Sequence, residues 1–342
     1  MPIPEAILYL TEDDVRRTLT VAEAVDLAEL GIKADAAGRV AGDKFYMDVA
    51  PNGFIKPFSG YMAGEDLAFV KTFSFFPGNP GRFGRSTTSS VVLLFDATSG
   101  LPVCLMEAGW VTALKTGAST AVTAATLARP GASAVTIFGA GSLGRMHLRA
   151  LACRFALQQA YVVDILPEAA GRYAADLGSE LALPVEAVPL SERERAVRNS
   201  DIIITVTTGD QPLVERHWLR PGAFVARLGS YQEVALDVIT GAAKLIVDNW
   251  HYVRPRIPEL KMLAAGNAFG PGDVHAEWPE IVAGTKPGRE SASEIIVYIA
   301  LGIWGEYAAI LPEVYRRARS LGLGHRLAPP FREAPRPATS EE

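Results

Sequence analysis

Residues 135–144 read VTIFGAGSLG, and this stretch decides the fold. Its first four residues form a short apolar, β-branched run that is typical of a buried parallel strand. Gly139, Gly141 and Gly144 follow with the spacing G-x-G-x-x-G, and a run of helix-forming residues comes next. Glycines at these places allow a tight turn, a close approach of the backbone to a diphosphate, and close packing of helix on strand. The free N–H groups and the positive end of the helix dipole then face the phosphates.

A glycine turn alone is a weak signal, so the segments after it matter. About twenty residues beyond Gly144, residues 161–163 read as a second short strand that ends at Asp164. A carboxylate at this place accepts hydrogen bonds from the adenosine ribose and would repel a 2′-phosphate. Residues 201–208 and 224–229 read as further strands. The sequence predicts an α/β protein with a Rossmann-type, doubly wound domain that binds NAD in preference to NADP; a glycine turn without a ligand is the alternative.

Composition limits the possible classes of protein. A chain of 342 residues with 49% hydrophobic and 21% charged residues is ordinary for a globular enzyme of two domains. The net charge of -5 gives no basic surface for nucleic acid or an anionic membrane. Two cysteines, both expected in the core, and five scattered histidines predict neither a disulfide framework nor a metal site. The amino terminus lacks the pattern of a secretion signal, so we expect a cytoplasmic protein.

The remaining segments suggest a second domain built around the first. We expect a helix from Thr11 to Gly38, opened by a capping box of Thr11 with Asp14. Strands broken by turns follow up to residue 106, including a hairpin of residues 89–95 and 101–106. A helix over 111–127 leads into the dinucleotide domain, which we place at 126–302. The amphipathic segment 302–321 is expected to form a last helix that folds back on the first domain, and residues 331–342 a disordered tail.

Three lysines are candidates for the chemistry. In a strand over residues 67–75, Lys71 shares a face with Phe69, Phe73 and Phe75, and burial among aromatic rings would lower its pKa and prepare it for proton transfer. The alternative is an edge-strand lysine that reaches past these rings to water. Lys115 is the only charged residue between Glu107 and Arg129, which favours a role in holding a substrate carboxylate. Lys44 could share that role.

Several segments, taken together, resemble the ornithine cyclodeaminase/μ-crystallin family over nearly the whole chain. They are the lysine strand FVKTF at 69–73 with FPGNP at 76–80, the hairpin LFD at 94–96 with SGLP at 99–102, VTALKTGA at 111–118, the glycine motif, WLRPGA at 218–223, and residues 277–284. The resemblance implies a homodimer of two-domain subunits. Residues 1–125 and about 303–330 would bind substrate and form the dimer.

The resemblance also implies a reaction: hydride transfer between nicotinamide C4 and the α-carbon of an amino or imino acid. By similarity Lys71 would contact the substrate nitrogen and help to move its proton, while Lys44 and Lys115 would hold its carboxylate. The cofactor would be lined by Thr87, Gly139, Gly141, Ser142, Leu143, Gly144, Asp164, Thr205, Thr207, Leu228 and Gly229.

The chain departs from the family at three places. Lys115, and often Lys44, stand where members commonly carry arginine, and a lysine cannot form a bidentate fork to a carboxylate. Tyr231 stands at or near the aspartate that cyclodeaminases place after the strand ending near Gly229, and we expect it to contact substrate. Residues 298–302 lack the usual Asp-Ser pair. Without that aspartate the distal ammonium of ornithine or lysine loses its positioning group. The sequence thus favours an NAD(P)-dependent imine reductase or amino-acid dehydrogenase; a cyclodeaminase and a low-turnover binding protein are the alternatives.

Overall fold

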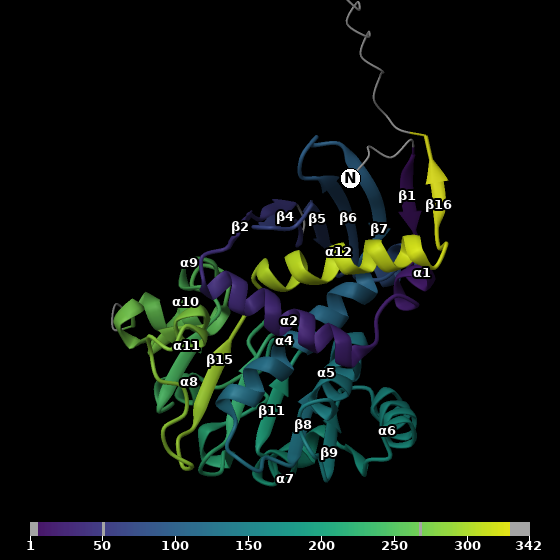
Figure 1. Ribbon diagram of the computed structural model, residues 1–342. Helices are drawn as coiled ribbons and strands as arrows, with labels where there is room; N and C mark the ends of the chain where they lie inside the picture. The colour runs from purple at the N-terminus through teal and green to yellow at the C-terminus, as the bar shows by residue number, and fades with distance from the viewer. Residues whose placement is uncertain (1–5, 50–51, 267–268, 329–342) are drawn as a thin grey trace, which may run out of the picture.

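The computed structural model describes residues 6–49, 52–266 and 269–328. The predicted tail at 331–342 lies outside these residues. Two sheets, one above the other in Figure 1, organise the chain.

The first sheet is mostly antiparallel and is built from both ends of the chain. Its order is β16 (His325–Leu327), β1 (Ile7–Leu10), β7 (Pro102–Glu107), β6 (Thr88–Asp96), β5 (Leu67–Phe75), β4 (Gly53–Met62) and β2 (Val40–Lys44), with β3 (Met47–Val49) also on β4. The predicted hairpin is confirmed: β6 pairs antiparallel with β7, and the Asp96 carboxylate accepts from the amides of Thr98 and Ser99 in the turn.

The second sheet is entirely parallel among the described strands. Its order is β10 (Val185–Val188), β9 (Gln159–Val163), β8 (Ala134–Phe138), β11 (Ile202–Thr205), β12 (Phe224–Arg227), β15 (Ile296–Ile299), β13 (Lys244–Val247) and β14 (Ala276–Glu277). Neighbouring side chains of β8 enter different apolar clusters, Ile137 one and Phe138 the other, so both faces of the sheet are covered. After β8 the chain continues to β9 and β10 on one side of β8, and it then crosses to β11 and β12 on the other side. The direction of the strand order changes at β8, and Rossmann folds bind their ligands at such a switch point. The predicted Rossmann-type α/β fold is confirmed.

Helices cover the sheets and connect them. They are α1 (Glu12–Arg16), α2 (Val21–Ala36), α3 (Asn79–Phe83), α4 (Gly109–Leu127), α5 (Ser142–Ala152), α6 (Pro167–Leu181), α7 (Arg193–Arg198), α8 (Leu236–Thr240), α9 (Trp250–Val253), α10 (Pro258–Ala265), α11 (Trp278–Val282) and α12 (Gly305–Ser320), with short 3₁₀ turns at Leu190–Glu192, Arg216–Trp218 and Pro271–Asp273. In the part of the chain that the structure describes, no helix is both long and apolar enough to cross a bilayer.

The prediction of one helix from Thr11 to Gly38 was wrong, because two helices occupy this segment. The expected capping box of Thr11 and Asp14 is present at α1. A second capping box, Thr20 with Glu23, opens α2. The Thr20 side chain and the Glu23 carboxylate satisfy the free amides of a new helix start, so the chain breaks between the two caps.

The last long helix returns to the beginning of the chain, as predicted. In Figure 1 α12 (yellow) lies beside α2 (purple), and the two are in contact. Gly31 and Gly305 form the crossing point, since a Cβ on either glycine would collide with the carbonyl oxygen of the other. This close crossing places the start of α12, and with it Tyr307, against the inner face of the first sheet, where Tyr307 meets Phe58 and Phe69.

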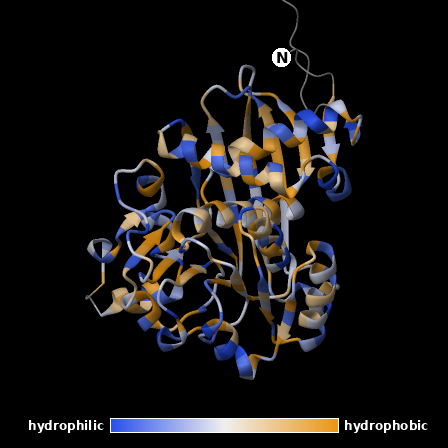
Figure 2. Ribbon diagram, turned by 60° about the horizontal axis from the view of Figure 1, so that its bottom comes forward, coloured by the Kyte–Doolittle hydropathy of each residue, from blue (hydrophilic) through white to orange (hydrophobic). Residues whose placement is uncertain are grey.

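Hydrophobic residues are concentrated in the strands of both sheets (Figure 2). Cys104 belongs to this core on β7. The expectation that Cys153 is also a core residue was wrong: it is exposed just after α5, where its Sγ bonds the carbonyl of Arg149.

Candidate functional site

A cavity of about 160 Å³ lies between the two sheets. The first sheet and α4 contribute one wall, which includes Lys71, Phe73 and Lys115. The carboxyl edge of the second sheet contributes the other, with Leu228 and Ser230 after β12 and Leu143 at the start of α5. A cavity needs only about 10–15 Å³ of such volume to hold one water, so this space is large enough for a small organic acid.

Lys71 lies on the inner face of the first sheet and is only 3% exposed, which excludes the alternative of a lysine that reaches water. Its Nζ is 5.1 Å from the ring centroid of Phe73 and 5.3 Å from that of Tyr307. Burial lowers the pKa of the Lys71 ammonium to about 7; nearby Lys115 lowers it as well, and Glu107 acts in the opposite direction. A primary amine with a pKa near neutrality can both donate and accept a proton.

Lys115 projects from α4 into the same cavity. Its Nζ lies 4.7 Å from the Tyr307 ring centroid, so Lys115 and Lys71 both place their amines close to this one ring. Lys115 also faces Glu306, a fully buried acid at the start of α12 that accepts a hydrogen bond from Ser119. Burial raises the pKa of Glu306, and the charge of Lys115 opposes that shift.

Lys44 lies beside the cavity, outside the set of residues that line it. It is 3% exposed, its ammonium donates to the carbonyl of Gly302, and it lies 4.7 Å from the ring centroid of Tyr252. Burial lowers the pKa of Lys44, while Asp248 raises it. The structure thus brings Lys44 to the wall formed by residues 301–302.

Lys56 lines the cavity and was missed by the sequence analysis. It lies on β4 directly opposite Phe73 of β5, while Phe58 lies opposite Lys71, so Lys56 and Lys71 are diagonal neighbours on one sheet face. Its Nζ is 5.4 Å from the ring centroids of Tyr46 and Phe73. Burial lowers the pKa of Lys56 well below the usual value, and the charges of Lys44, Lys71 and Lys115 add to this. The alternation of β4 would have put Lys56 and Phe58 on one face, but nothing in the sequence indicated that this face is turned to a site.

The glycine turn has the shape that a dinucleotide requires. Gly139 has φ +107°, and a Cβ there would lie 2.7 Å from the carbonyl oxygen of Val206. A Cβ on Gly144 would collide with the carbonyl of Gly139, so α5 packs directly against the turn. Gly141 has no atom within 4 Å of its Cβ position and precedes α5, whose start has no side-chain cap. The first amides of α5 are therefore available for an anion, and the residues fit a diphosphate.

A second cavity, of about 340 Å³, is lined in part by Gly139 and Gly141 of this turn. Asp164 lies at its edge, after β9, as the sequence predicted. One oxygen of its carboxylate accepts from the amide of Ala140 at 2.8 Å and the other from Leu166 at 2.9 Å. Each oxygen keeps a second lone pair, so the carboxylate can still accept bonds from a ribose. The first cavity thus reaches Leu143 at the start of α5, and the second reaches Gly139 and Gly141 in the turn before it.

A fully buried acid, Glu233, organises the loops at this edge and was also missed. It accepts hydrogen bonds from the amide and hydroxyl of Thr207, at 2.6 and 3.0 Å, and from the Gly229 amide at 2.7 Å. The hydroxyl of Thr205 donates to it as well, so Thr205 is turned to Glu233 and does not line either cavity. Glu259, paired with Arg227, in turn accepts from the amide of Glu233.

Five other predicted residues line neither cavity: Gly144 and Gly229, described above, and Ser142, Thr87 and Tyr231. Ser142 is exposed at the first position of α5. Thr87 precedes β6, and its carbonyl accepts from the Phe76 amide. Tyr231 has its ring centroid 6.1 Å from that of Phe75, and the preceding residue, Ser230, reaches the substrate cavity.

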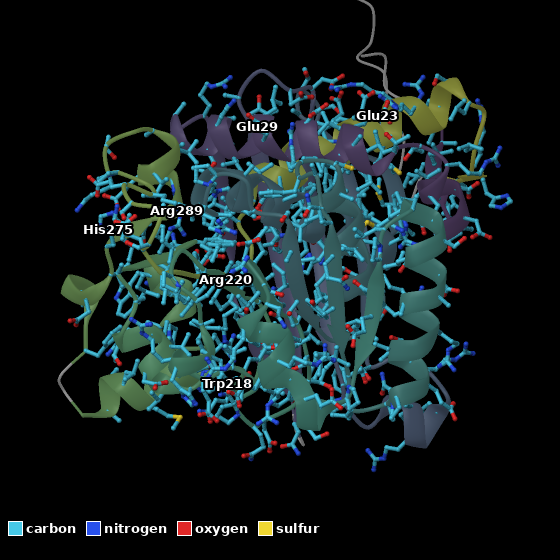
Figure 3. All side chains as sticks on the ribbon, turned by 90° about the horizontal axis from the view of Figure 1, so that it is seen from below. Glu23, Glu29, Trp218, Arg220, His275 and Arg289 are labelled. Carbon is cyan, nitrogen blue, oxygen red and sulfur yellow. The ribbon has the colours of Figure 1, made fainter. Side chains whose placement is uncertain are left out.

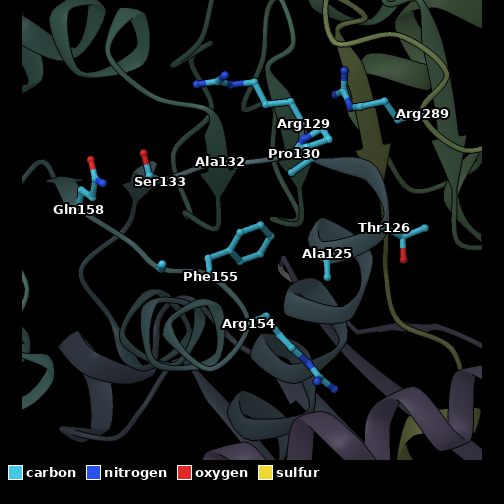
Figure 4. A pocket seen from close by; sticks show the side chains of 13 residues that line it. Ala125, Thr126, Arg129, Pro130, Ala132, Ser133, Arg154, Phe155, Gln158 and Arg289 are labelled. Atoms are coloured by element: carbon cyan, nitrogen blue, oxygen red, sulfur yellow. The ribbon is translucent and has the colours of Figure 1, made fainter.

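A wider concavity of about 710 Å³ is lined by three arginines but does not offer a comparable site (Figure 4). Arg129 bonds the buried carboxylate of Asp201, and Arg154 bonds Asp26 and Glu29. Arg289, which is labelled in Figures 3 and 4, donates to the carbonyls of Leu127, Ser291 and Glu294. These guanidinium groups hold the protein together. In the described ranges, no group of three or more His, Cys, Asp or Glu residues is placed to hold a metal ion.

Comparison with known proteins gives consistent results. The chain is 29% identical to an N-((2S)-2-amino-2-carboxyethyl)-L-glutamate dehydrogenase of Staphylococcus aureus, over 72% of this chain and 73% of that one. The structure of a Δ(1)-pyrroline-2-carboxylate reductase of Thermococcus litoralis with NADH and L-proline has a TM-score of 0.89 and 28% identity, covering 94% of this chain and 100% of that one. An archaeal alanine dehydrogenase dimer with bound NAD has a TM-score of 0.86 and 26% identity, covering 94% and 98%.

These relatives agree with the predicted class, an NAD-dependent oxidoreductase that acts on a carbon–nitrogen bond. The family described as ornithine cyclodeaminase/mu-crystallin matches residues 6–322. Because this match spans almost the entire chain, the protein belongs to the ornithine cyclodeaminase/mu-crystallin family.

Proposed function

We propose that this protein is an NAD-dependent imine reductase or amino-acid dehydrogenase, which transfers a hydride between nicotinamide and the α-carbon of an amino or imino acid. One observation carries the proposal. Lys71, a buried amine with a pKa near neutrality, faces the same small cavity as Leu143 and Leu228 at the carboxyl edge of the Rossmann sheet. A proton-transferring group and the place for a nicotinamide ring thus share one enclosed space.

The chain's own residues account for binding and proton transfer. Bound nicotinamide supplies the hydride donor or acceptor. In the reductive direction Lys71 Nζ gives a proton to the substrate nitrogen, and in the oxidative direction it takes that proton back. Lys115 attracts the α-carboxylate, and Lys44 adds positive charge behind the wall while holding the Gly302 carbonyl. The aromatic rings of Phe73 and Tyr307 exclude water and keep both ammonium groups in place.

The cavity is less suited to a cyclodeaminase. That reaction needs a carboxylate to position the distal ammonium of a diamino acid. Among the described residues, none of those lining the cavity is an aspartate or glutamate, whereas three are lysines. A diamino acid would add a further positive charge to this group.

The proposal includes NAD as the cofactor and a homodimer as the assembly. Asp164 supports NAD, because it would repel the 2′-phosphate of NADP. The outer face of the first sheet supports the dimer. On it Tyr61, Val70 and Val91 are 36%, 39% and 46% exposed on three neighbouring strands, an apolar area that a second subunit would cover.

A substrate screen that follows two products tests the proposed function. Purified protein is incubated with NADH and a panel of imino acids, including cyclic imines and 2-oxo acids mixed with ammonia or amines, while NADH and ammonia are both measured. We expect stoichiometric NADH oxidation. Ammonia release from ornithine or lysine with catalytic NAD and no net NADH change would identify a cyclodeaminase instead. Binding of dinucleotide and imino acids without turnover would favour the binding-protein alternative.

A further inference from the structure

The substrate cavity holds more lysine amines than one substrate nitrogen and one carboxylate would use. Lys56, Lys71 and Lys115 line it, and Lys44 lies close enough behind the wall to affect the pKa of Lys56. None of these four lysines takes part in an ion pair with a described acid.

The acids around the cavity bond to groups other than these lysines, and Glu107 and Glu306 each keep one buried oxygen without a partner. Asp248 accepts from the amides of Asn249 and Leu301, Glu107 from Gly109, and Glu306 from Ser119. None of these three acids lines the cavity, although Glu306 faces Lys115. Amines held together in a partly enclosed, aromatic-lined space disfavour one another's protonated form, and an anion that enters the space favours that form again.

Lys56 has no task in the reaction proposed above. Lys71 exchanges a proton with the substrate nitrogen, and Lys115 binds the α-carboxylate. Lys56 lies diagonally from Lys71 on the same sheet face. Neighbours at this diagonal are about 7–8 Å apart at Cα. The separation suits a ligand whose second charged group lies a few bonds from its α-nitrogen.

The surroundings of Lys56 also favour an anion over an apolar side chain. Its ammonium lies 5.4 Å from the ring centroids of Tyr46 and Phe73, which remove water from two sides. An amino acid with an apolar side chain would leave this ammonium without a partner, which costs binding energy. A carboxylate would supply that partner through a charge-assisted hydrogen bond.

We propose that the substrate is an α-imino or α-amino acid with a second carboxylate, four or five carbons long, and that Lys56 binds the second carboxylate. This inference rests on the proposed function and names its substrate class. In the reductive direction the C=N bond receives a hydride at carbon from NADH and a proton at nitrogen from Lys71. The products are NAD and an acidic amino acid, with both carboxylates unchanged.

The test compares matched substrates that differ in the second carboxylate. Initial rates are measured with NADH, ammonia and either oxaloacetate or pyruvate, and 2-oxoglutarate with ammonia extends the chain by one carbon. We expect kcat/KM to be at least tenfold higher for one of the two dicarboxylates than for pyruvate. In Lys56→Met, which keeps the side chain long and removes its charge, the ratio of kcat/KM for the dicarboxylate to kcat/KM for pyruvate should fall at least tenfold. Lys33→Met, on the exposed face of α2, is the matched control and should change neither rate.

Equilibrium binding gives a second readout that does not depend on turnover. Calorimetry with protein loaded with NAD should show tighter binding of L-aspartate or L-glutamate than of L-alanine, and Lys56→Met should remove the difference. The assignment of Lys56 would be overturned if kcat/KM for pyruvate equals or exceeds that for both dicarboxylates and L-alanine binds as tightly as the acidic amino acids. The proposed function would then remain in place. Failure to bind dinucleotide, together with no NADH oxidation by any imino acid, would overturn both.

Discussion

The ammonium of Lys115 lies where a side chain on Gly302 would have to be. A Cβ on Gly302 would fall 2.5 Å from Lys115 Nζ, and Gly302 has a φ of +85°, a conformation that favours glycine. The carbonyl of the same residue accepts a hydrogen bond from Lys44. One glycine after β15 therefore positions two of the lysines that we assign to the substrate carboxylate.

We expect Gly302→Ala to impair substrate binding more than stability. The methyl group would push Lys115 from its place, so KM should rise and kcat/KM should fall at least tenfold. Forcing a positive φ on alanine costs about 1 kcal/mol by itself. Gly284→Ala is a suitable control, because Gly284 also has a positive φ (+71°) but no atom within 4 Å of its Cβ position. The control should lose similar stability in thermal unfolding and keep full activity; equal activity of both variants would contradict this role of Gly302.

The lowered pKa of Lys71 predicts the pH dependence of both directions of the reaction. Burial and Lys115 bring this pKa to about 7, so the amine is neutral above pH 7 and protonated below it. Amine oxidation needs the neutral form, so its kcat/KM should rise as pH increases through about 7. Imine reduction needs the protonated form, so its kcat/KM should fall over the same range. Steady-state rates in both directions between pH 5.5 and 9 check this.

Substitution of Lys71 separates proton transfer from cofactor binding. Lys71→Arg stays protonated at all accessible pH values and should lose amine oxidation by at least a hundredfold, while NADH binding remains within about twofold. An arginine variant that oxidises amines at the normal rate would remove Lys71 from the mechanism.

The sequence predicted those parts of the molecule that depend on local pattern. The turn at 139–144, the acid at 164 and the lysine on a strand with Phe73 are set by spacing and alternation within one segment, and the structure has each of them where it was expected. The break between α1 and α2 was missed because the Thr20–Glu23 cap lies inside a longer helical pattern.

The parts that were missed depend on contacts between distant segments. Lys56 belongs to the site only because β4 pairs with β5 and α12 closes over the same face. Glu233 is significant because its carboxylate meets two loops, after β11 and after β12. In the sequence alone it is one acid among 38 acidic residues, with no pattern to distinguish it.

Asp164 should determine the choice between the two dinucleotides. Its carboxylate is fixed by two backbone amides and would repel a 2′-phosphate. Fluorescence titration should show NADH binding at least tenfold more tightly than NADPH. Asp164→Ser should reduce this difference in affinity, mainly because the variant binds NADPH more tightly. Tighter binding of NADPH by the unmodified protein would contradict this assignment.

The exposed apolar face of the first sheet predicts a dimer that a single charge can dissociate. Val70 is 39% exposed on β5 and points away from the cavity, since its neighbour Lys71 points into it. Val70→Glu would bury a charge at the interface, so light scattering after gel filtration should change from a dimer to a monomer mass. Leu321→Glu, at an exposed apolar position after α12, is the control and should remain dimeric. A monomeric unmodified protein would refute the assembly.

Glu233 should act on cofactor binding through the loops that it holds. Its two oxygens accept four hydrogen bonds, from Thr205, Thr207 and Gly229. In Glu233→Gln one oxygen becomes an NH₂ group that cannot accept, so a buried donor loses its partner at a cost of about 1–3 kcal/mol. Thr207 and Gly229 lie on the loops after β11 and β12, so part of this cost should appear as a dissociation constant for NADH that is about tenfold higher.

A weaker NADH affinity of Glu233→Gln has to be distinguished from a general loss of stability of this variant. NADH titrations are therefore made well below the unfolding temperature of the variant, with Glu186→Gln on β10, an exposed position, as the control. If Glu233 positions the loops, affinity falls at temperatures where the variant is fully folded. If it only stabilises the fold, the unfolding temperature drops while the affinity for NADH stays unchanged, and Glu233 has no role in cofactor binding.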